Sequence, residues 1–296
     1  IQVGRDHGAR PGDIVGAIAN EAEIDSQFIG QIQLFAQHSL VQLPKGMPAE
    51  LKKAFQMIEE AKKIDLNAIK FQTFKAKEFC GDPSQTYTYK SQGKEITESM
   101  IEMFSRYEFS NDEWGKIKEK CNSEKITFLS TPQNYSDLEL LLKLRIDAIK
   151  VGSDDLTNLP LLKKYSSTNL PIILSSGMST LDEISDALNN VGFFDGYPTI
   201  LLVTTSQYPT PNKDVNLLKF HTLTEQFPDL PLGFSDHTIG NTAASIACGM
   251  GSIFFEKHFT LDCNFNGPDH WFSANPEQLK KWRDSVITSF EMLGSP

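Results

Sequence analysis

Two histidines near the carboxyl end of the chain stand in matching settings. His237 follows Gly233-Phe-Ser-Asp236, His258 follows Phe255-Glu-Lys257, and each histidine closes a short apolar run. The small-residue segment 239–251 between them predicts a helix, which makes the pattern strand, helix, strand. Parallel α/β proteins place ligands and metals at the carboxyl ends of their strands. The pair therefore predicts a shared site for two imidazoles.

The chemistry expected of this pair is metal binding. Imidazole nitrogens suit transition metals such as Mn, Zn or Fe better than Mg or Ca, which prefer oxygen ligands. Two histidines rarely complete a metal site, so waters, substrate oxygens or an acid must supply the other ligands. Asp269 is the nearest candidate acid in the sequence, whereas we expect its neighbour His270 to stabilise the loop.

Two lysines stand inside apolar segments that predict strands. Lys70 lies in the segment 68–74 and Lys150 in the segment 148–153. An unpaired buried ammonium group is costly, so we expect both to point into the mouth of a site and share an anion. The alternative is that they extend from strand ends to solvent. Hydroxyl side chains at other strand ends, including Thr131, Ser175 and Ser235, favour a phosphate or carboxylate pocket.

The elements that would position these residues alternate along the chain. Helical periodicity at 50–63, 111–124, 136–144, 159–165, 180–189, 215–227 and 276–292 separates seven short strand patterns, and 80–99 reads as a long loop. Strands alternating with helices indicate an α/β fold with a parallel sheet. Residues 40–43 are placed to supply an eighth strand. We therefore predict a (β/α)₈ TIM barrel, with an open doubly wound sheet as the alternative; no Gly-x-Gly-x-x-Gly turn supports the alternative.

Composition narrows the function classes. The 296 residues carry a net charge of −10, which disfavours general binding to nucleic acid or anionic membranes. The sequence has no apolar run of membrane-spanning length and no secretion signal. The four cysteines have no metal-finger spacing, and reduced thiols in the cytoplasm are the expected state.

The first 47 residues differ in character and predict an atypical α+β segment. A strand at 1–4, a helix at 12–23 and a hairpin formed by 28–35 and 40–43 are expected. Segments 3–22 and 43–48 resemble the RNA-binding domain at the carboxyl end of bacterial DEAD-box RNA helicases. Through Ala49 this segment has three basic and five acidic residues, whereas RNA affinity needs a positive surface. We expect the segment to supply structure and not to bind RNA.

From about residue 50 to the end, the motifs resemble the sialic acid synthase family. The matching motifs, in order, are 70–74, 129–132, 150–153, 174–180, 208–211, 233–240, 256–262 and 267–270. The resemblance implies a (β/α)₈ barrel that condenses phosphoenolpyruvate with an N-acetylated amino sugar such as N-acetylmannosamine. It further implies release of phosphate, use of Mn or Mg, and a homodimer.

The resemblance also implies roles for individual residues. Those expected to hold phosphoenolpyruvate are Lys70, Thr131, Lys150, Ser153, Ser175, Ser206 and Ser235. His237 and His258 would bind the metal that polarises the sugar aldehyde. The residues expected to contact the sugar are Gln72, Asp155, Tyr208 and Asp269. Lys70, His258 and Asp155 are the expected catalytic residues, with Asp155 transferring a proton; the family often has Glu at this position, and Asn where Ser206 stands.

Two departures from the family pattern limit these expectations. Family members open the barrel with Ala-Glu-Ile-Gly-x-Asn-His, whose Glu reaches the active site. Here Ala22-Glu-Ile-Asp25 keeps three of these letters, about 25 residues too early, so Glu23 is a weak candidate. Family members also continue into an antifreeze-like domain that places an Arg in the partner subunit's site, and residues 48–296 lack it. The alternatives are a pseudaminic or legionaminic acid synthase, or an impaired fusion with residual RNA binding.

Overall fold

The computed structural model describes residues 10, 13, 32–34, 39–41 and 49–294. The chain divides into two compact units, residues 1–52 and 53–296, and the boundary falls within helix α2 (Ala49–Lys63). The predicted strand at 1–4, most of the predicted helix at 12–23, and Glu23 lie outside the described residues.

In the first unit, strands β1 (Ile32–Leu34) and β2 (Ser39–Val41) form an antiparallel pair in which Ile32 lies opposite Val41. The predicted hairpin is confirmed within these residues. The prediction that 40–43 supplies a barrel strand is wrong, because Leu40 and Val41 pair with β1 in a separate two-stranded sheet. Strand β1 is close to β2 in the sequence, and pairing between close segments costs less chain entropy than pairing between distant ones.

The second unit contains a seven-stranded sheet in the order β11-β10-β9-β8-β7-β6-β3, with every pairing parallel. The strands are β3 (Ala68–Thr73), β6 (Thr127–Pro132), β7 (Ile149–Val151), β8 (Ile172–Ser175), β9 (Thr199–Val203), β10 (Leu232–Asp236) and β11 (Phe254–Lys257). All seven predicted strand segments are confirmed, as is the α/β class. Each strand lies beside the next one in sequence, which is the order of a sheet that winds in one direction.

The sheet is curled, because side chains of its two edge strands meet. Nζ of Lys70 in β3 lies 3.5 Å from Oε2 of Glu256 in β11. In a flat sheet, six inter-strand steps of roughly 4.8 Å would separate these strands by roughly 29 Å. The open doubly wound alternative is therefore wrong, since it would leave the two edges far apart.

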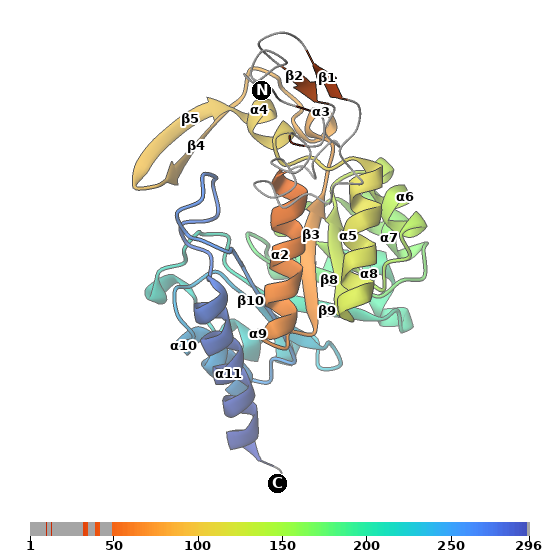
Figure 1. Ribbon diagram of the computed structural model, residues 1–296. Coiled ribbons are helices and arrows are strands. Elements are labelled where there is room, and N and C mark those ends of the chain that lie inside the picture. Colours follow the sequence, from red (N-terminus) through yellow and green to blue (C-terminus); the bar gives the residue numbers. More distant parts are fainter. Residues whose placement is uncertain (1–9, 11–12, 14–31, 35–38, 42–48, 295–296) are drawn as a thin grey trace. The chain divides into compact units, whose positions relative to one another are not determined.

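Helices connect the strands (Figure 1). They are α5 (Asn111–Glu124), α6 (Tyr135–Lys143), α7 (Leu159–Ser166), α8 (Leu181–Val191), α9 (Lys219–Gln226), α10 (Thr242–Gly249) and α11 (Pro276–Leu293), with short 3₁₀ turns at η3 (Ser153–Asp155), η4 (Phe193–Asp195) and η5 (Asn212–Asp214). Side chains satisfy the free backbone N–H groups at several helix starts. Ser110 and Glu113 form a capping box on α5, and Thr180 and Glu183 form another on α8.

The prediction of a long loop at 80–99 is wrong, because much of this segment forms two strands. After the short helix α3 (Ala76–Phe79), β4 (Thr86–Ser91) and β5 (Lys94–Ser99) form an antiparallel hairpin that leads into α4 (Met100–Ser105) and projects from the sheet (Figure 1). Gln92 and Gly93 at its tip both have positive φ, at 52° and 75°, as a two-residue hairpin turn requires. Its polar composition hid the alternating Thr and Tyr residues of a strand.

Inside the curl, an apolar layer supports a polar one. Leu129, Ile173 and Leu202 pack together there, and the residues that pack against them are Ala68, Ala148, Ile200 and Phe254. Side chains two residues apart share a face of a strand. The next inward positions are therefore Lys70, Thr131, Lys150, Ser175, Thr204 and Glu256. Alternation alone thus places four of the predicted site residues, Lys70, Thr131, Lys150 and Ser175, on the inner surface.

Candidate functional site

Two lysines converge on one carboxylate at the centre of the polar layer. Glu256 lies 3.5 Å from the ammonium of Lys70 and 3.8 Å from that of Lys150. Lys150 is only 2% exposed, and it donates hydrogen bonds to Oγ of Ser175 at 2.7 Å and to the backbone oxygen of Val151 at 2.9 Å. Ser235 donates to Glu256 at 2.8 Å. Five different strands, β3, β7, β8, β10 and β11, therefore contribute side chains to one network.

The charges of this network leave a positive surplus. Burial alone would raise the pKa of Glu256, but Lys150 and Lys70 outweigh it and lower that pKa to about 2. Burial lowers the pKa of Lys150 to about 8, against the opposing pull of Glu256. At pH 7 Lys150 and Glu256 are both charged, and Lys70 adds a second cation. Two ammonium groups and one carboxylate leave one positive charge for an anionic ligand.

The two histidines face each other beside this network. Their ring centroids lie 5.3 Å apart. Nδ1 of His237 lies 2.8 Å from the backbone oxygen of Thr205, which assigns the ring proton to Nδ1 and leaves Nε2 as the acceptor. That acceptor lies 3.3 Å from Oγ of Ser235, which joins the histidines to the lysine network.

Both imidazoles are neutral at pH 7. Burial lowers the pKa of His237, and burial together with the nearby His237 lowers the pKa of His258 to about 3. Solvent still reaches 33% of the His258 side chain. Neutral imidazole is the form that binds metal ions.

Asp269 and Tyr208 lie at the mouth of the site. Oδ2 of Asp269 lies 3.9 Å from Nδ1 of His258. Neighbouring protein atoms displace much of the water around Asp269, and this burial raises its pKa to about 6. Solvent nevertheless reaches 57% of the side chain. The Tyr208 ring lies 4.3 Å from that of His237, and Phe272 completes the aromatic wall.

Ser153 and Ser206 meet at Gly177. The backbone N–H of Gly177 donates to Oγ of Ser153 at 3.0 Å. A Cβ atom at Gly177 would lie 2.3 Å from Oγ of Ser206 and 2.7 Å from Oγ of Ser153, so only glycine fits between them. The Ser206 hydroxyl is buried and has no hydrogen-bond partner in the described part of the chain. Such a group normally has a partner, which a bound ligand or water would provide.

The remaining predicted residues are less closely connected. Thr131 is buried in β6, opposite the exposed Gln72 of β3. Asp155 lies in η3, where it accepts a hydrogen bond from Asn158 at 3.2 Å. Burial raises the pKa of Asp155. Its observed partner thus belongs to its own turn and not to the lysine or histidine groups.

Glu256 is the central residue that the sequence interpretation did not assign. It stands two positions before His258, so strand alternation puts both on the inner face. That signal was available in the sequence. Its meeting with Lys70 was not, because only the curl brings β3 and β11 together.

Two histidines alone are the metal-binding set that the site offers. Within the described ranges, no three or more His, Cys, Asp or Glu side chains are grouped closely enough to hold a metal ion. The two neutral, oriented imidazoles fit a transition metal whose other ligands come from water or substrate.

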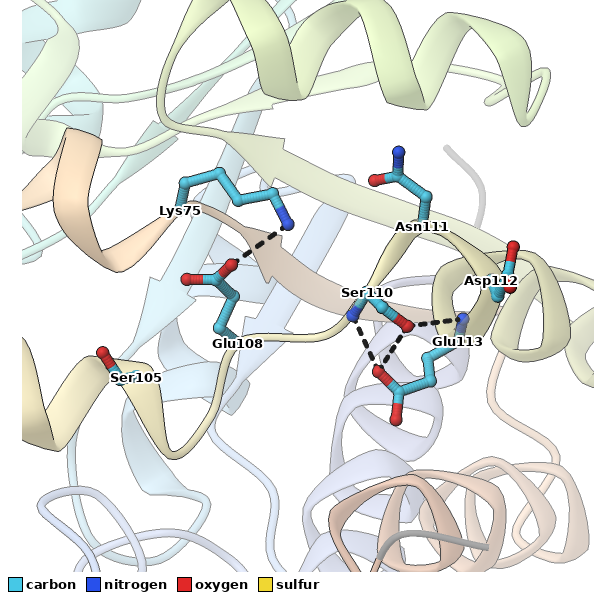
Figure 2. Close-up of a pocket in the computed structure, with 7 residues that line it drawn as sticks. All are labelled: Lys75, Ser105, Glu108, Ser110, Asn111, Asp112 and Glu113. Atoms are coloured by element: carbon cyan, nitrogen blue, oxygen red, sulfur yellow. Dashed lines mark hydrogen bonds and ion pairs between the residues drawn. The ribbon is translucent and has the colours of Figure 1, made fainter. Parts of the chain in front are cut away.

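A separate surface depression of about 730 Å³ lies at the start of α5 and is drawn in Figure 2. In this depression Lys75 is paired with Glu108 at 3.2 Å, and Ser110 and Glu113 form the capping box of α5. These groups thus serve local structure.

Among the described helices, none is long and apolar enough to cross a membrane.

Known structures define the class of fold. The crystal structure of N-acetylneuraminic acid synthetase from Leptospira borgpetersenii matches with a TM-score of 0.75 and 27% identity, covering 90% of this chain and 91% of that one. A truncated 3-deoxy-D-arabino-heptulosonate 7-phosphate synthase from Thermotoga maritima shares the fold alone, with a TM-score of 0.62 at 13% identity. The curled α/β sheet is thus a synthase fold.

The family is defined by sequence. The model of the NeuB family matches residues 57–296, and the chain belongs to this family. It is 35% identical to the N,N'-diacetyllegionaminic acid synthase of Legionella pneumophila over 83% of this chain and 70% of the relative. It is 30% identical to the human N-acetylneuraminate-9-phosphate synthase over 87% of this chain and 71% of the relative. The chain is a synthase-type transferase of the nonulosonic acid kind.

The amino-terminal residues match a different family. The model of the DbpA RNA-binding domain matches residues 1–67, as the helicase resemblance predicted. The two matches overlap between residues 57 and 67, within and just after helix α2.

Proposed function

We propose that the chain condenses phosphoenolpyruvate with an N-acetylated amino sugar of the N-acetylmannosamine type, giving a sialic-acid-type nonulosonic acid and phosphate. The observation that carries the proposal is the direct contact between two different half-sites. A positively charged lysine network lies beside a pair of neutral histidines, and the Ser235 hydroxyl, which donates to Glu256, also lies 3.3 Å from Nε2 of His237. One half suits a multiply charged anion and the other suits a carbonyl oxygen.

The lysine half would hold phosphoenolpyruvate. Lys70 and Lys150 supply the cations, and Ser175 is already hydrogen-bonded to Lys150. The buried Ser206 hydroxyl offers an unused donor. Thr131, Ser153 and Ser235 complete the set that the family pattern assigns to this substrate. Charge-assisted hydrogen bonds of this kind are shorter and stronger than neutral ones.

The histidine half would bind the sugar and a divalent metal, Mn or Mg. His237 and His258 would hold the metal, which when bound would polarise the sugar aldehyde. The Nδ1–H of His237 donates to the backbone oxygen of Thr205, and a hydrogen bond of this kind fixes the direction of the other ring nitrogen, which would be the ligand. Asp269, Tyr208 and Gln72 would contact the sugar hydroxyls. Asp155 remains the proposed proton-transfer residue, although its present partner is Asn158.

The bonds balance with these substrates and one water. Carbon 3 of phosphoenolpyruvate forms a bond to the aldehyde carbon, whose oxygen takes up a proton. Water then adds to carbon 2, and the tetrahedral intermediate loses phosphate to leave a ketone. The lysines would hold the phosphate and carboxylate throughout, so that carbon 3 faces the histidine half.

The wider parts of the proposal rest on the family. They comprise closure of the sheet by an eighth strand, a structural role for residues 1–47, a barrel at 48–296, a homodimer and a cytoplasmic location. A second candidate substrate is a diacetylated sugar, which is supported by the relative from Legionella pneumophila. A pseudaminic acid precursor is a third, since a Helicobacter pylori relative is a pseudaminic acid synthase. RNA binding has the DbpA match in its favour and the segment charge against it.

A phosphate-release assay tests the proposal. The purified chain is mixed with phosphoenolpyruvate and each of several N-acetylated amino sugars, with Mn or with a chelator, and products are identified by mass spectrometry. We expect sugar-dependent release of phosphate that stops on chelation. Release without sugar, or release that survives chelation, would contradict the proposal. RNA binding that saturates and persists in moderate salt would instead support the RNA alternative.

A further inference from the structure

One side chain beside the exposed turn of the β4–β5 hairpin is buried, which is unusual so close to a hairpin tip. Ser91, next to the turn, is only 1% exposed, whereas the turn residues Gln92 and Gly93 are exposed. The tip makes contact with the loop that follows β11, about 175 residues further along the chain. Loops are normally solvated, so a buried serine at such a place needs a specific partner.

The partner is the segment 264–267. The Ser91 hydroxyl donates to Oδ1 of Asn266 at 3.0 Å and accepts the backbone N–H of Gly267 at 3.3 Å. Gln92 adds a bond from its side-chain amide to the backbone oxygen of Asn264 at 2.9 Å. Tyr107, just beyond α4, donates to the backbone oxygen of Asn266 at 3.2 Å.

The backbone of this loop has little freedom at Gly267. Its φ is +150°, and a Cβ atom there would lie 2.8 Å from the Tyr107 hydroxyl and 2.9 Å from the His270 ring. Only glycine accepts that conformation and that crowding. The hairpin side therefore holds Gly267 from one direction while the His270 ring confines it from the other.

Two residues further on, the same loop carries Asp269. Its carboxylate lies 3.9 Å from Nδ1 of His258, and its backbone oxygen accepts hydrogen bonds from the N–H and hydroxyl of Ser273. His270 is fixed by Thr260, at 2.7 Å between Nδ1 and Oγ1. The hairpin thus holds the loop before Asp269, and Ser273 and Thr260 hold Asp269 and His270 themselves.

We propose that Ser91 is a positioning residue, which clasps the Asp269 loop and sets the distance between Asp269 and His258. The hydroxyl group is suited to this task because it donates and accepts at once. The consequence for substrate binding rests on the proposed function, in which Asp269 contacts the sugar. Loss of the clasp would weaken sugar binding and leave the lysine half unchanged, since no lysine of that half touches the loop contacts described above.

Hydrogen exchange tests the clasp without any activity. In Ser91→Ala we expect the Gly267 amide to exchange about tenfold faster, the usual effect of losing one hydrogen bond. Amides of β10 and β11 would keep their rates. Thr88→Ala is the matched control, because it removes a hydroxyl from the same strand where Thr88 pairs with Thr97 on the exposed face. An unchanged Gly267 rate in Ser91→Ala would overturn the proposal.

A double-variant cycle and kinetics test the positioning role. Asn266 is exposed, so Asn266→Ala leaves no cavity, and its effect should not add to that of Ser91→Ala. With active enzyme, we expect KM for the sugar to rise about tenfold in Ser91→Ala, while KM for phosphoenolpyruvate stays within about twofold. Faster exchange with an unchanged KM and kcat for the sugar would overturn the positioning role. If the wild-type chain condenses no sugar, the proposed function fails, and the exchange rates alone decide the clasp.

Discussion

The inner and outer faces of β10 and β11 each carry a carboxylate beside lysine, but the two carboxylates differ in how completely they are hydrogen-bonded. On the outer face, Asp236 accepts hydrogen bonds from Lys257 at 2.9 Å, from the Trp282 indole at 2.8 Å, and from the N–H and hydroxyl of Thr238 at 2.9 and 2.7 Å. On the inner face, Glu256 has one short hydrogen bond, from Ser235, and two ion pairs at 3.5 and 3.8 Å.

The difference separates a structural network from one that can accept a ligand. The outer carboxylate is fully bonded, and its partners join the strands to α11 and fix the turn after His237. The inner groups keep unused capacity, with a surplus cation, a free imidazole nitrogen and a buried Ser206 hydroxyl without a partner. Fully satisfied polar groups add rigidity, while unsatisfied ones need an explanation. Variants on the two faces should therefore affect different measurements.

The largest effect is expected from His258→Ala on the inner face. Loss of one of two imidazoles should remove metal binding and lower kcat/KM on the order of 10⁴-fold, or about 5 kcal/mol of transition-state stabilisation. Stability should change little, because the His258 ring is partly exposed. The measurement is phosphate release with a metal titration. The exposed His221→Ala of α9 is the control; activity retained in His258→Ala would break the comparison.

The next effect should come from Asp236→Ala on the outer face. Removing one partner of a buried ion pair leaves Lys257 without compensation, which costs about 3–4 kcal/mol of unfolding free energy. Denaturant unfolding measures this loss. The double variant Asp236→Ala, Lys257→Met should recover most of it, because it removes both charges. A loss below about 1 kcal/mol in the single variant would show that the outer network is not structural.

Lys150→Met separates the two halves of the inner face. Methionine keeps the length of the side chain and removes the charge, so phosphoenolpyruvate should bind about 100-fold more weakly, or about 2.7 kcal/mol. Metal affinity should stay within about twofold, because Lys150 contacts Ser175 and Glu256 and not the histidines. Calorimetry of each ligand alone gives both constants. Lys163→Met, on the exposed side of α7, is the control; equal losses of both ligands would contradict the assignment.

The sequence was enough to predict the inner face in large part. The strand segments were visible from their apolar runs, and alternation put Lys70, Lys150, His237 and His258 on one side of their strands. It was not enough to predict which side chains meet across the curl, because Lys70 and Glu256 are 186 positions apart and lie on opposite edges of the sheet. Contacts of that kind depend on the closure of the whole sheet.

Two other features escaped for different physical reasons. The β4–β5 hairpin is polar on much of its surface, so it lacks the apolar face by which strands are found. Asp155 has the residue type expected of a proton-transfer group, but the 3₁₀ turn η3 directs it to Asn158. Residue type can be read from a sequence, whereas the direction of a side chain in a turn follows from local backbone geometry.

The smallest effect tests whether lack of partners alone marks a functional group. Asp137 in the first turn of α6 is 1% exposed and lies outside both networks, and neither carboxylate oxygen has a hydrogen bond of good geometry among the described residues. The backbone N–H groups of Gln133 and Asn134 lie near enough to lower its pKa, but burial outweighs them. Burial raises its pKa to about 6, above the value of about 3.9 expected when unfolded. The folded chain therefore binds this proton more tightly, and the stability that it contributes is lost as pH rises from about 4 to 6.

Asp137→Asn should then be more stable than the wild type at pH 7 and lose part of the pH dependence of unfolding. The raised pKa sets an upper limit of about 3 kcal/mol, and water near the helix terminus should reduce the gain to about 1–2 kcal/mol. Unfolding at pH 5 and pH 7 measures it, with Asp186→Asn on the exposed side of α8 as the control. A less stable Asn variant would mean that the carboxylate has a partner. A more stable variant with full activity would show that burial of an acid without good hydrogen bonds does not by itself mark a functional group.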